Sequence, residues 1–287
     1  MSKSIGHALA EAARQIDALD ARVLLCHVMR KAAAYLIAHA GESLDPQQGR
    51  TFDALVARRA TGEPVAYITG RREFFGLDFH VTPAVLIPRP ETELLVELAL
   101  ARIPENTACH VLDLGTGSGC AAISIARHRP HAEVTAVDGS PEALALAGEN
   151  ARALAVHNVA FAAGDWFSAV AGRRFDLVVS NPPYVAESDP HLAEGDLRFE
   201  PPLALCGGRD GLDAIRAIVA QAEQHLSADG SLLFEHGYDQ GAASRALLRA
   251  AGFQAIASWP DLAGHERVSG GQKLDVTAGE PLNSKAD

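Results

Sequence analysis

The chain has few cysteines, few tryptophans and no excess of positive charge. Its 287 residues include four cysteines and two tryptophans, and the formal net charge is −11. The cysteines lie far apart and form no CxxC pair, so we expect reduced, mostly buried thiols and neither disulfides nor a thiolate metal site. The negative charge disfavours a general duplex-DNA binder, which needs a basic face to displace counterions.

Other functional signatures are also missing from the sequence. No apolar run is long enough to span a bilayer and no signal-peptide pattern is present, so we expect a cytoplasmic protein without a membrane partner. No G-x-S-x-G motif indicates acyl chemistry. His128 and His131 have no acid or thiol at ligand spacing, which predicts no metal site.

What the chain does contain is a hydrophobic content of 48%, enough for a substantial core. Apolar residues at helical spacing predict a small helical bundle over residues 1–72, with helices near residues 5–16, 19–28 and 52–59. Apolar and polar residues alternate along residues 73–88, which predicts a β-hairpin linker. Residues 89–275 alternate strand and helix, as expected of an α/β domain with a doubly wound parallel sheet, and residues 276–287 are predicted to be a flexible tail.

Residues 181–184, Asn-Pro-Pro-Tyr, are the most informative motif of the chain. They follow the apolar run 175–180, which has the pattern of a buried strand. Two successive prolines fix two φ angles and remove two backbone donors, which leaves a stiff loop. Its Asn amide, carbonyl acceptors and aromatic face suit a planar –NH2 group, whose two N–H bonds need two acceptors. Asn-Pro is also an ordinary turn dipeptide, so the motif alone does not decide.

A glycine-rich turn at residues 115–119 separates a predicted strand, 111–114, from a predicted helix, 120–126. Glycines allow a tight turn and a close approach of backbone N–H groups to a ligand. The next predicted strand ends at Asp138, whose carboxylate can accept hydrogen bonds from a ribose diol. Because residues 117–122 also fit the G-x-G-x-x-A pattern, the cofactor contains adenosine but can be either NAD or S-adenosylmethionine.

A further acid follows the predicted strand 159–163, in a segment predicted to be a loop, Gly-Asp-Trp-Phe (164–167). Asp165 can accept a hydrogen bond from an adenine amino group, and Trp166 offers a flat apolar surface; alternatively, Trp166 only plugs the sheet edge. Open α/β sheets bind ligands at the carboxyl ends of their strands. We therefore expect the glycine turn, Asp138, this segment and the Asn-Pro-Pro-Tyr motif to converge on one crevice.

Taken together, these motifs resemble those of class I S-adenosylmethionine-dependent methyltransferases. Residues 62–70, 85–93 and 189–201 narrow the resemblance to the glutamine methyltransferases of peptide chain release factors, and the similarity covers nearly the whole chain. It implies a seven-stranded, Rossmann-like methyltransferase domain. It also implies that the reaction places a methyl group on the side-chain amide nitrogen of the glutamine in a Gly-Gly-Gln motif.

The resemblance assigns roles to particular residues. The catalytic set would be Asn181, Pro182 and Tyr184: the Asn181 side-chain oxygen and the Pro182 carbonyl would accept the substrate N–H bonds, and Tyr184 would line the slot. The substrate-binding set would add three residues near the opening for the peptide: Pro183, Arg89 and Glu91. The cofactor-binding set would comprise Gly115, Thr116, Gly117, Ser118, Gly119, Asp138, Asp165, Trp166 and Asn181.

The expected partner is a class I release factor, with no stable nucleic-acid binding and with a monomer favoured. Two other functions stay open. An adenine exocyclic-amine methyltransferase acting on DNA or RNA would use a similar Asn-Pro-Pro-aromatic loop, although the acidic charge disfavours it. An NAD-dependent oxidoreductase is supported by the glycine pattern alone.

One segment departs from the family pattern. Gly270-Gly271-Gln272 repeats the tripeptide expected in the substrate. We interpret the glycines as part of a turn near a final strand. The competing hypothesis is that this segment visits the pocket of a neighbouring molecule as a weak substrate or inhibitor.

Overall fold

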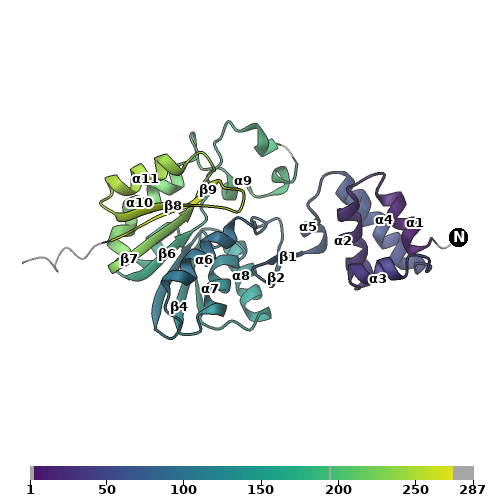
Figure 1. The fold of residues 1–287 in the computed structure, drawn as a ribbon, viewed down its shortest axis with the longest axis horizontal. Helices are drawn as coiled ribbons and strands as arrows, with labels where there is room; N and C mark the ends of the chain where they lie inside the picture. The colour runs from purple at the N-terminus through teal and green to yellow at the C-terminus, as the bar shows by residue number, and fades with distance from the viewer. Residues whose placement is uncertain (1–2, 194, 274–287) are drawn as a thin grey trace, which may run out of the picture.

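The N-terminal part of the chain is a separate helical body. A computed structural model describes residues 3–193 and 195–273, and places this body at one end of the molecule (Figure 1). It consists of α1 (Ile5–Ala12), α2 (Ala18–Met29), α3 (Ala33–Ala38), α4 (Pro46–Ala60) and α5 (Val65–Thr69). Its own core includes the fully buried side chains of Ile5, Leu24 and Phe52. The predicted helical bundle is thus confirmed.

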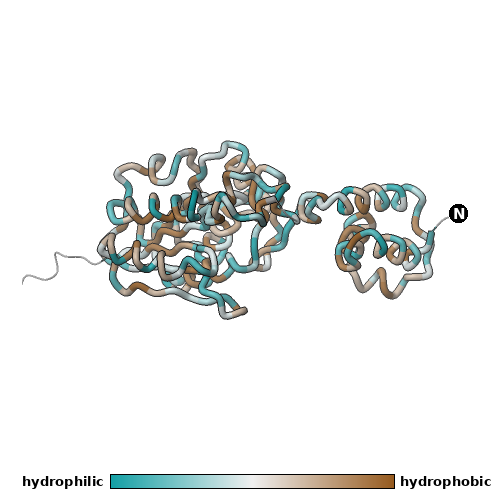
Figure 2. Tube along the Cα trace, turned by 90° about the horizontal axis from the view of Figure 1, so that it is seen from above, coloured by the Kyte–Doolittle hydropathy of each residue, from teal (hydrophilic) through white to brown (hydrophobic). Residues whose placement is uncertain are grey.

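A short hairpin follows the helices. Strands β1 (Arg71–Phe74) and β2 (Leu77–His80) pair in antiparallel fashion, with Phe74 opposite Leu77. The hairpin is shorter than the predicted segment 73–88 and begins two residues earlier. Phe74 and Phe79 are buried in the core of the larger body, so the hairpin packs against that body. Figure 2 shows the narrow connection between the two bodies.

The larger body is built on a seven-stranded sheet with the order β5-β4-β3-β6-β7-β9-β8. All neighbouring pairs are parallel except those of β9. The strands are β3 (Cys109–Leu114), β4 (Ala132–Asp138), β5 (Val159–Ala163), β6 (Phe175–Ser180), β7 (Leu226–Glu235), β8 (Gln254–Pro260) and β9 (Glu266–Gln272). The strand order reverses between β3 and β6, which is where such sheets bind ligands.

Helices cover both faces of this sheet. One face packs against α6 (Thr92–Arg102), α7 (Cys120–His128) and α8 (Pro141–Ala153). The other packs against the 3-10 helix η1 (Trp166–Val170), α10 (Asp213–His225) and α11 (Gly241–Ala250). Shorter elements are η2 (Pro190–Ala193), η3 (Leu197–Phe199) and α9 (Pro202–Leu205). The doubly wound α/β fold expected from the sequence is confirmed.

The two bodies meet through the segment that contains η3. The Arg59 guanidinium on α4 bonds to Asp20 at 2.7 Å and to Asp196 at 2.8 Å. The Arg198 side chain donates to the Thr61 carbonyl. Because Pro201, three residues after Arg198, lines the cavity described below, the helical body is linked to a segment that reaches this cavity.

The interpretation of Gly270 and Gly271 as a turn is wrong. Both lie in β9, which pairs with β7 on one side and β8 on the other. A Cβ at Gly270 would lie 2.4 Å from the Leu232 carbonyl oxygen, and one at Gly271 would lie 2.9 Å from the Phe253 Cβ. The glycines are therefore required by close packing. The tripeptide is held inside the sheet, which removes the basis for the idea that it visits another pocket.

This packing predicts that Gly270→Ala destabilises the protein. Forcing a methyl group into a well-packed interior costs about 1–3 kcal/mol of unfolding free energy. Gly49→Ala in α4 is the control, because a Cβ there meets nothing within 4 Å and alanine favours a helix. Chemical denaturation of both variants measures the difference. A Gly270→Ala protein as stable as the control would contradict the packing explanation.

All four cysteines are free, as expected, and Cys109 is buried. Cys26, Cys120 and Cys206 are half-buried. Within residues 3–193 and 195–273, no helix has the length and apolar character needed to cross a membrane.

Candidate functional site

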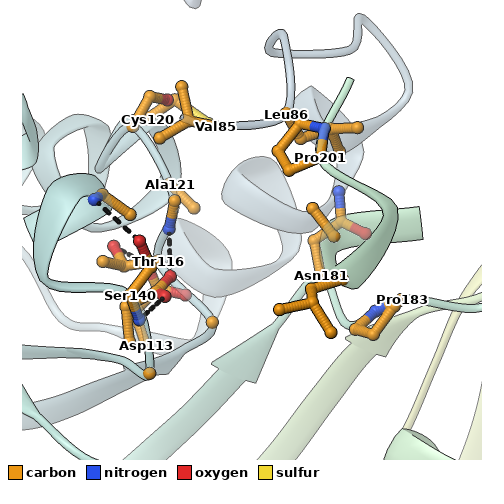
Figure 3. A pocket seen from close by; sticks show the side chains of 18 of the residues that line it. Val85, Leu86, Asp113, Thr116, Cys120, Ala121, Ser140, Asn181, Pro183 and Pro201 are labelled. Atoms are coloured by element: carbon orange, nitrogen blue, oxygen red, sulfur yellow. Dashed lines mark hydrogen bonds between the residues drawn. The ribbon is translucent and has the colours of Figure 1, made fainter. Parts of the chain in front are cut away.

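A cavity of about 420 Å³ opens at the carboxyl ends of β3, β4, β5 and β6. This size falls in the range typical of small-molecule sites. Its walls come from residues in the segments 84–92, 113–121, 138–143, 164–166, 181–183 and 201–204. Figure 3 shows Asp113, Thr116 and Ser140 on one wall, with Asn181 and Pro183 opposite. The convergence expected from the sequence is therefore present.

The glycine turn forms part of one wall of the cavity. Gly115, Thr116, Gly117 and Ser118 line the cavity. Gly119 does not; it is the N-cap residue directly before α7 and has a φ of 82°. A Cβ at Gly119 would lie 2.7 Å from the Ile123 Cδ1, so glycine is required for the turn to pack against its own helix.

Asp138 connects the glycine turn to the start of α8. Its Oδ2 accepts a hydrogen bond from the Gly117 N–H at 2.8 Å, and its Oδ1 accepts one from the Ser140 N–H at 2.9 Å. A carboxylate has about four lone-pair sites, so acceptor capacity remains on the side that lines the cavity. This geometry suits a pair of ribose hydroxyls.

Asp113 is a cavity residue to which the sequence analysis assigned no role. It is buried in β3, and its Oδ2 accepts a hydrogen bond from the Thr116 hydroxyl at 2.6 Å. Burial raises the pKa of Asp113 to about 6. The available signal was an acid inside the apolar run Val-Leu-Asp-Leu, where an unpaired carboxylate would be costly. Through its bond with the Thr116 hydroxyl, Asp113 anchors the glycine turn to β3.

Asp165 and Trp166 line the cavity after β5, as predicted. The segment is not all loop, however, because η1 begins at Trp166, which has a φ of 46°. The ring of Trp166 lies beside the glycine turn: a Cβ on Gly115 would be 3.7 Å from the Trp166 Cζ3. This position suits contact with a ring in the cavity, and the alternative of an edge plug fits less well.

The opposite wall carries Asn181 and Pro183 at the end of β6. The Asn181 Nδ2 donates to the Thr92 hydroxyl at 2.9 Å, which leaves Oδ1 as the free end of the amide. Pro182 is buried and, like Tyr184, is not among the residues that line the cavity. The Tyr184 hydroxyl instead donates to Glu235 at 3.0 Å. The structure therefore places Tyr184 behind the wall.

Thr92 and Glu235 were not identified from the sequence. Thr92 begins α6 and lines the cavity, while Glu235 ends β7 and is fully buried. The Thr92 hydroxyl donates to the Glu235 carboxylate at 2.7 Å. Burial raises the pKa of Glu235 to about 7. The sequence signal that could have identified Glu235 was an acid at the end of the apolar run Ser-Leu-Leu-Phe-Glu (231–235).

Of the two charged residues expected at the opening of the cavity, one lines the cavity and the other does not. Arg89 lines the cavity and pairs with Glu200, whose side chain is completely buried and also accepts from the Ile87 N–H at 3.3 Å. Glu91 does not line the cavity. Near this pair, the Leu203 side chain is 91% exposed and contributes to the rim.

The lining fits an adenosine-containing cofactor: acceptors lie at the ends of β4 and β5, an indole ring faces the space, and the backbone of the glycine turn borders it. In the described parts of the chain, no group of three or more His, Cys, Asp or Glu side chains is arranged to hold a metal ion.

Comparison with known proteins agrees with this site. A family described as PrmC N-terminal domain matches residues 3–70, and one described as methyltransferase small domain matches residues 91–195. A methyltransferase structure from Pyrococcus furiosus covers 76% of this chain and 98% of its own at 19% identity with a TM-score of 0.55. A T. thermophilus 16S rRNA N2 G1207 methyltransferase, solved with AdoMet and guanosine, covers 71% of this chain and 49% of its own at 23% identity with a TM-score of 0.53. These two structures show the fold.

The curated relatives are much more similar. The release factor glutamine methyltransferase of Burkholderia pseudomallei is 55% identical over 91% of this chain and 93% of its own length. The Escherichia coli protein of that name is 45% identical over 93% of this chain and 98% of its own length. The chain belongs to the family of release factor glutamine methyltransferases, which are class I enzymes that use S-adenosylmethionine.

Proposed function

We propose that this protein transfers a methyl group from S-adenosylmethionine to the side-chain amide nitrogen of the glutamine in the Gly-Gly-Gln motif of class I peptide chain release factors. The observation that carries the proposal is the fixed Asn181 amide, which faces the glycine turn across the cavity with its oxygen free. The identity to the curated relatives supports the same substrate class.

The chemistry explains why such a wall is needed. S-adenosylmethionine, when bound, supplies a methyl group that its sulfonium already activates for displacement. An amide nitrogen is a poor nucleophile because it shares its lone pair with the carbonyl. The Asn181 Oδ1 and the Pro182 carbonyl oxygen accept hydrogen bonds from the two N–H groups of the substrate amide. These bonds turn the amide nitrogen toward the cofactor side of the cavity. Alignment of reacting atoms is worth roughly 7–11 kcal/mol, so positioning is the main contribution.

The reaction needs no strong general base. The amide proton becomes acidic as the new bond forms, and water accepts it. On the cofactor wall, Asp138 would accept hydrogen bonds from the ribose hydroxyls, Asp165 would accept one from the adenine amino group, and Trp166 would contact the adenine ring. Gly115, Thr116, Gly117 and Ser118 border the rest of the cofactor, and Gly119 keeps the turn against α7.

The remaining residues concern the protein substrate. Pro183 narrows the slot, Tyr184 supports it from behind, and Arg89 holds the segment around Glu200 and Pro201 at the opening. Glu91 would act at the outer edge. We assign substrate recognition to residues 1–72, because α4 is linked through Arg59 to the segment that reaches the cavity rim. Release factors act in translation, which places the reaction in the cytoplasm, and we favour a monomer.

A labelling experiment tests the substrate. The protein is incubated with methyl-labelled S-adenosylmethionine and a release factor, and with the same factor carrying asparagine in place of the motif glutamine. We expect label on the first factor only, with peptide mass spectrometry locating one methyl group on the glutamine. Label that persists on the substituted factor would contradict the proposed acceptor.

Nucleic-acid arms of the same experiment address the main alternative. Duplex DNA and ribosomal RNA are offered in place of the release factor under identical conditions. Label found only in nucleic acid would replace the proposed function with methylation of an exocyclic amine.

A further inference from the structure

Four side chains, two that line the cavity and two behind them, form one continuous series of hydrogen bonds. Asn181 Nδ2 donates to Thr92 Oγ1, Thr92 Oγ1 donates to Glu235 Oε2, and Tyr184 Oη donates to Glu235 Oε1. The four residues come from β6 and the loop after it, from the start of α6 and from the end of β7. Thr92 is 2% exposed and Glu235 is 0% exposed, so the bond between them is shielded from bulk water.

The number of protons available to these four side chains determines which group donates and which accepts in each hydrogen bond. An ionised carboxylate only accepts hydrogen bonds, so both Thr92 and Tyr184 must donate to Glu235. The Thr92 hydroxyl has a single proton, and once it is donated to Glu235 the oxygen can only accept from its other neighbour. The neighbouring end of the Asn181 amide must then be the donor, Nδ2. The carbonyl end, Oδ1, is consequently the end that is free to meet a ligand.

The backbone of the motif is held by other contacts. Gln240 Nε2 donates to the Tyr184 carbonyl at 3.0 Å, and the Val185 N–H donates to the Leu205 carbonyl at 2.9 Å. The Gly207 N–H donates to the Val185 carbonyl at 2.9 Å. Since the loop has these independent supports, the orientation of the Asn181 amide can change without displacement of the loop.

We propose that Glu235 is a positioning residue for the methyl transfer: acting through Thr92, it holds the Asn181 amide in the orientation that presents Oδ1 to the substrate. The inference rests on the proposed function, because it is the glutamine –NH2 group that requires an acceptor at this point. With the amide reversed, Nδ2 would face the substrate donors and would repel them.

The protonation state of Glu235 should therefore matter. The negative charge of Glu91, near the start of α6, disfavours ionisation of Glu235, and Arg267 of β9 favours it. Cys120, at the start of α7, has a pKa raised mainly by burial, so its thiol is neutral and adds no charge there. Burial outweighs the hydrogen bonds from Thr92 and Tyr184 and raises the pKa to about 7. Below that pH, a protonated Glu235 can donate to Thr92, which can then donate to Asn181 and stabilise the reversed amide.

A matched pair at residue 92 tests the connection. Thr92→Ser keeps the hydroxyl, whereas Thr92→Val keeps the shape and removes it. We expect kcat to fall about 100-fold in Thr92→Val, the scale of loss caused by a misplaced reacting group, and less than about threefold in Thr92→Ser. Affinity for S-adenosylhomocysteine should be unchanged in both. Thr135→Val makes the same chemical change at a buried threonine on β4 that accepts from Arg173, and its kcat should match the wild type.

A pH profile adds a readout that packing alone would not alter. In the wild type, kcat should be full above the pKa and decline as the pH falls through about 7, because ionised Glu235 is required. Glu235→Gln carries a permanent –NH2 group in place of one acceptor oxygen. Its kcat should be lower and should not vary with pH over the same range.

The outcomes separate this inference from the proposed function. A wild-type protein with no activity on the release factor would refute the function itself. An active wild type with equal kcat in Thr92→Val and Thr92→Ser would refute the positioning role, as would a Glu235→Gln variant that keeps the wild-type pH profile. If Glu235→Gln does not fold, the residue 92 pair decides the question.

Discussion

Asn181→Ala should abolish methyl transfer while leaving the cofactor site intact. The substitution removes the Asn181 amide from the wall opposite the glycine turn, and it leaves the Thr92 hydroxyl with one partner fewer. We expect kcat to fall about 100- to 1,000-fold, the loss seen when a preorganised hydrogen-bonding group at a reacting centre is removed. Affinity for S-adenosylhomocysteine, measured by calorimetry, should change less than about threefold.

A second asparagine provides a control for stability. Asn158 Nδ2 donates to the carbonyls of Ala126, Arg129 and Ala132, and Asn158 does not line the cavity. Asn158→Ala should lower the melting temperature, yet its kcat for each folded molecule should equal that of the wild type. If Asn181→Ala loses cofactor affinity and kcat in the same proportion, Asn181 mainly holds the cofactor and the acceptor role fails.

The sequence allowed the main features of the fold to be predicted because local signals agreed with the tertiary structure. The runs 175–180 and 159–163 are apolar and bounded by polar or glycine residues, and they form β6 and β5 with those bounds. The positions of Gly119 and Asp138 at turns could also be predicted, because the conformation of a turn depends mainly on residues close in sequence. Each of these features is encoded within about ten residues, where periodicity is most informative.

The misses have a common physical origin in long-range contacts. Gly270 and Gly271 carry a local signal for a turn, but insertion between β7 and β8 determines their conformation. The partnership of Thr92 with Glu235 joins residues 143 positions apart, and no local pattern announces it. Tyr184 was expected to face the substrate, but its hydroxyl satisfies Glu235 behind the wall, because a buried carboxylate needs donors.

The second large effect is expected at Asp138. Asp138→Asn keeps the shape of the side chain but replaces one acceptor oxygen with a donor. That donor would face either the Gly117 or the Ser140 N–H, and one acceptor for the ribose hydroxyls is lost as well. Hydrogen bonds to a charged group contribute about 1.5–3 kcal/mol each, so affinity for S-adenosylhomocysteine should fall about 100-fold for a loss near 3 kcal/mol.

Glu142→Gln separates this contact from simple loss of charge. Glu142 lies in the first turn of the same helix, α8, and is exposed. Its carboxylate accepts a hydrogen bond from the Ser140 hydroxyl at 3.2 Å, which a glutamine amide oxygen can also accept, so the variant removes one negative charge near the cavity and keeps this contact with the lining. Its cofactor affinity should stay within about twofold of the wild type, because exposed charges interact weakly in water. At saturating cofactor, Asp138→Asn should regain most of its kcat and keep the wild-type KM for the release factor. Equal losses of affinity in the two variants would mean that Asp138 acts through its charge alone, and the ribose contact would then have to be abandoned.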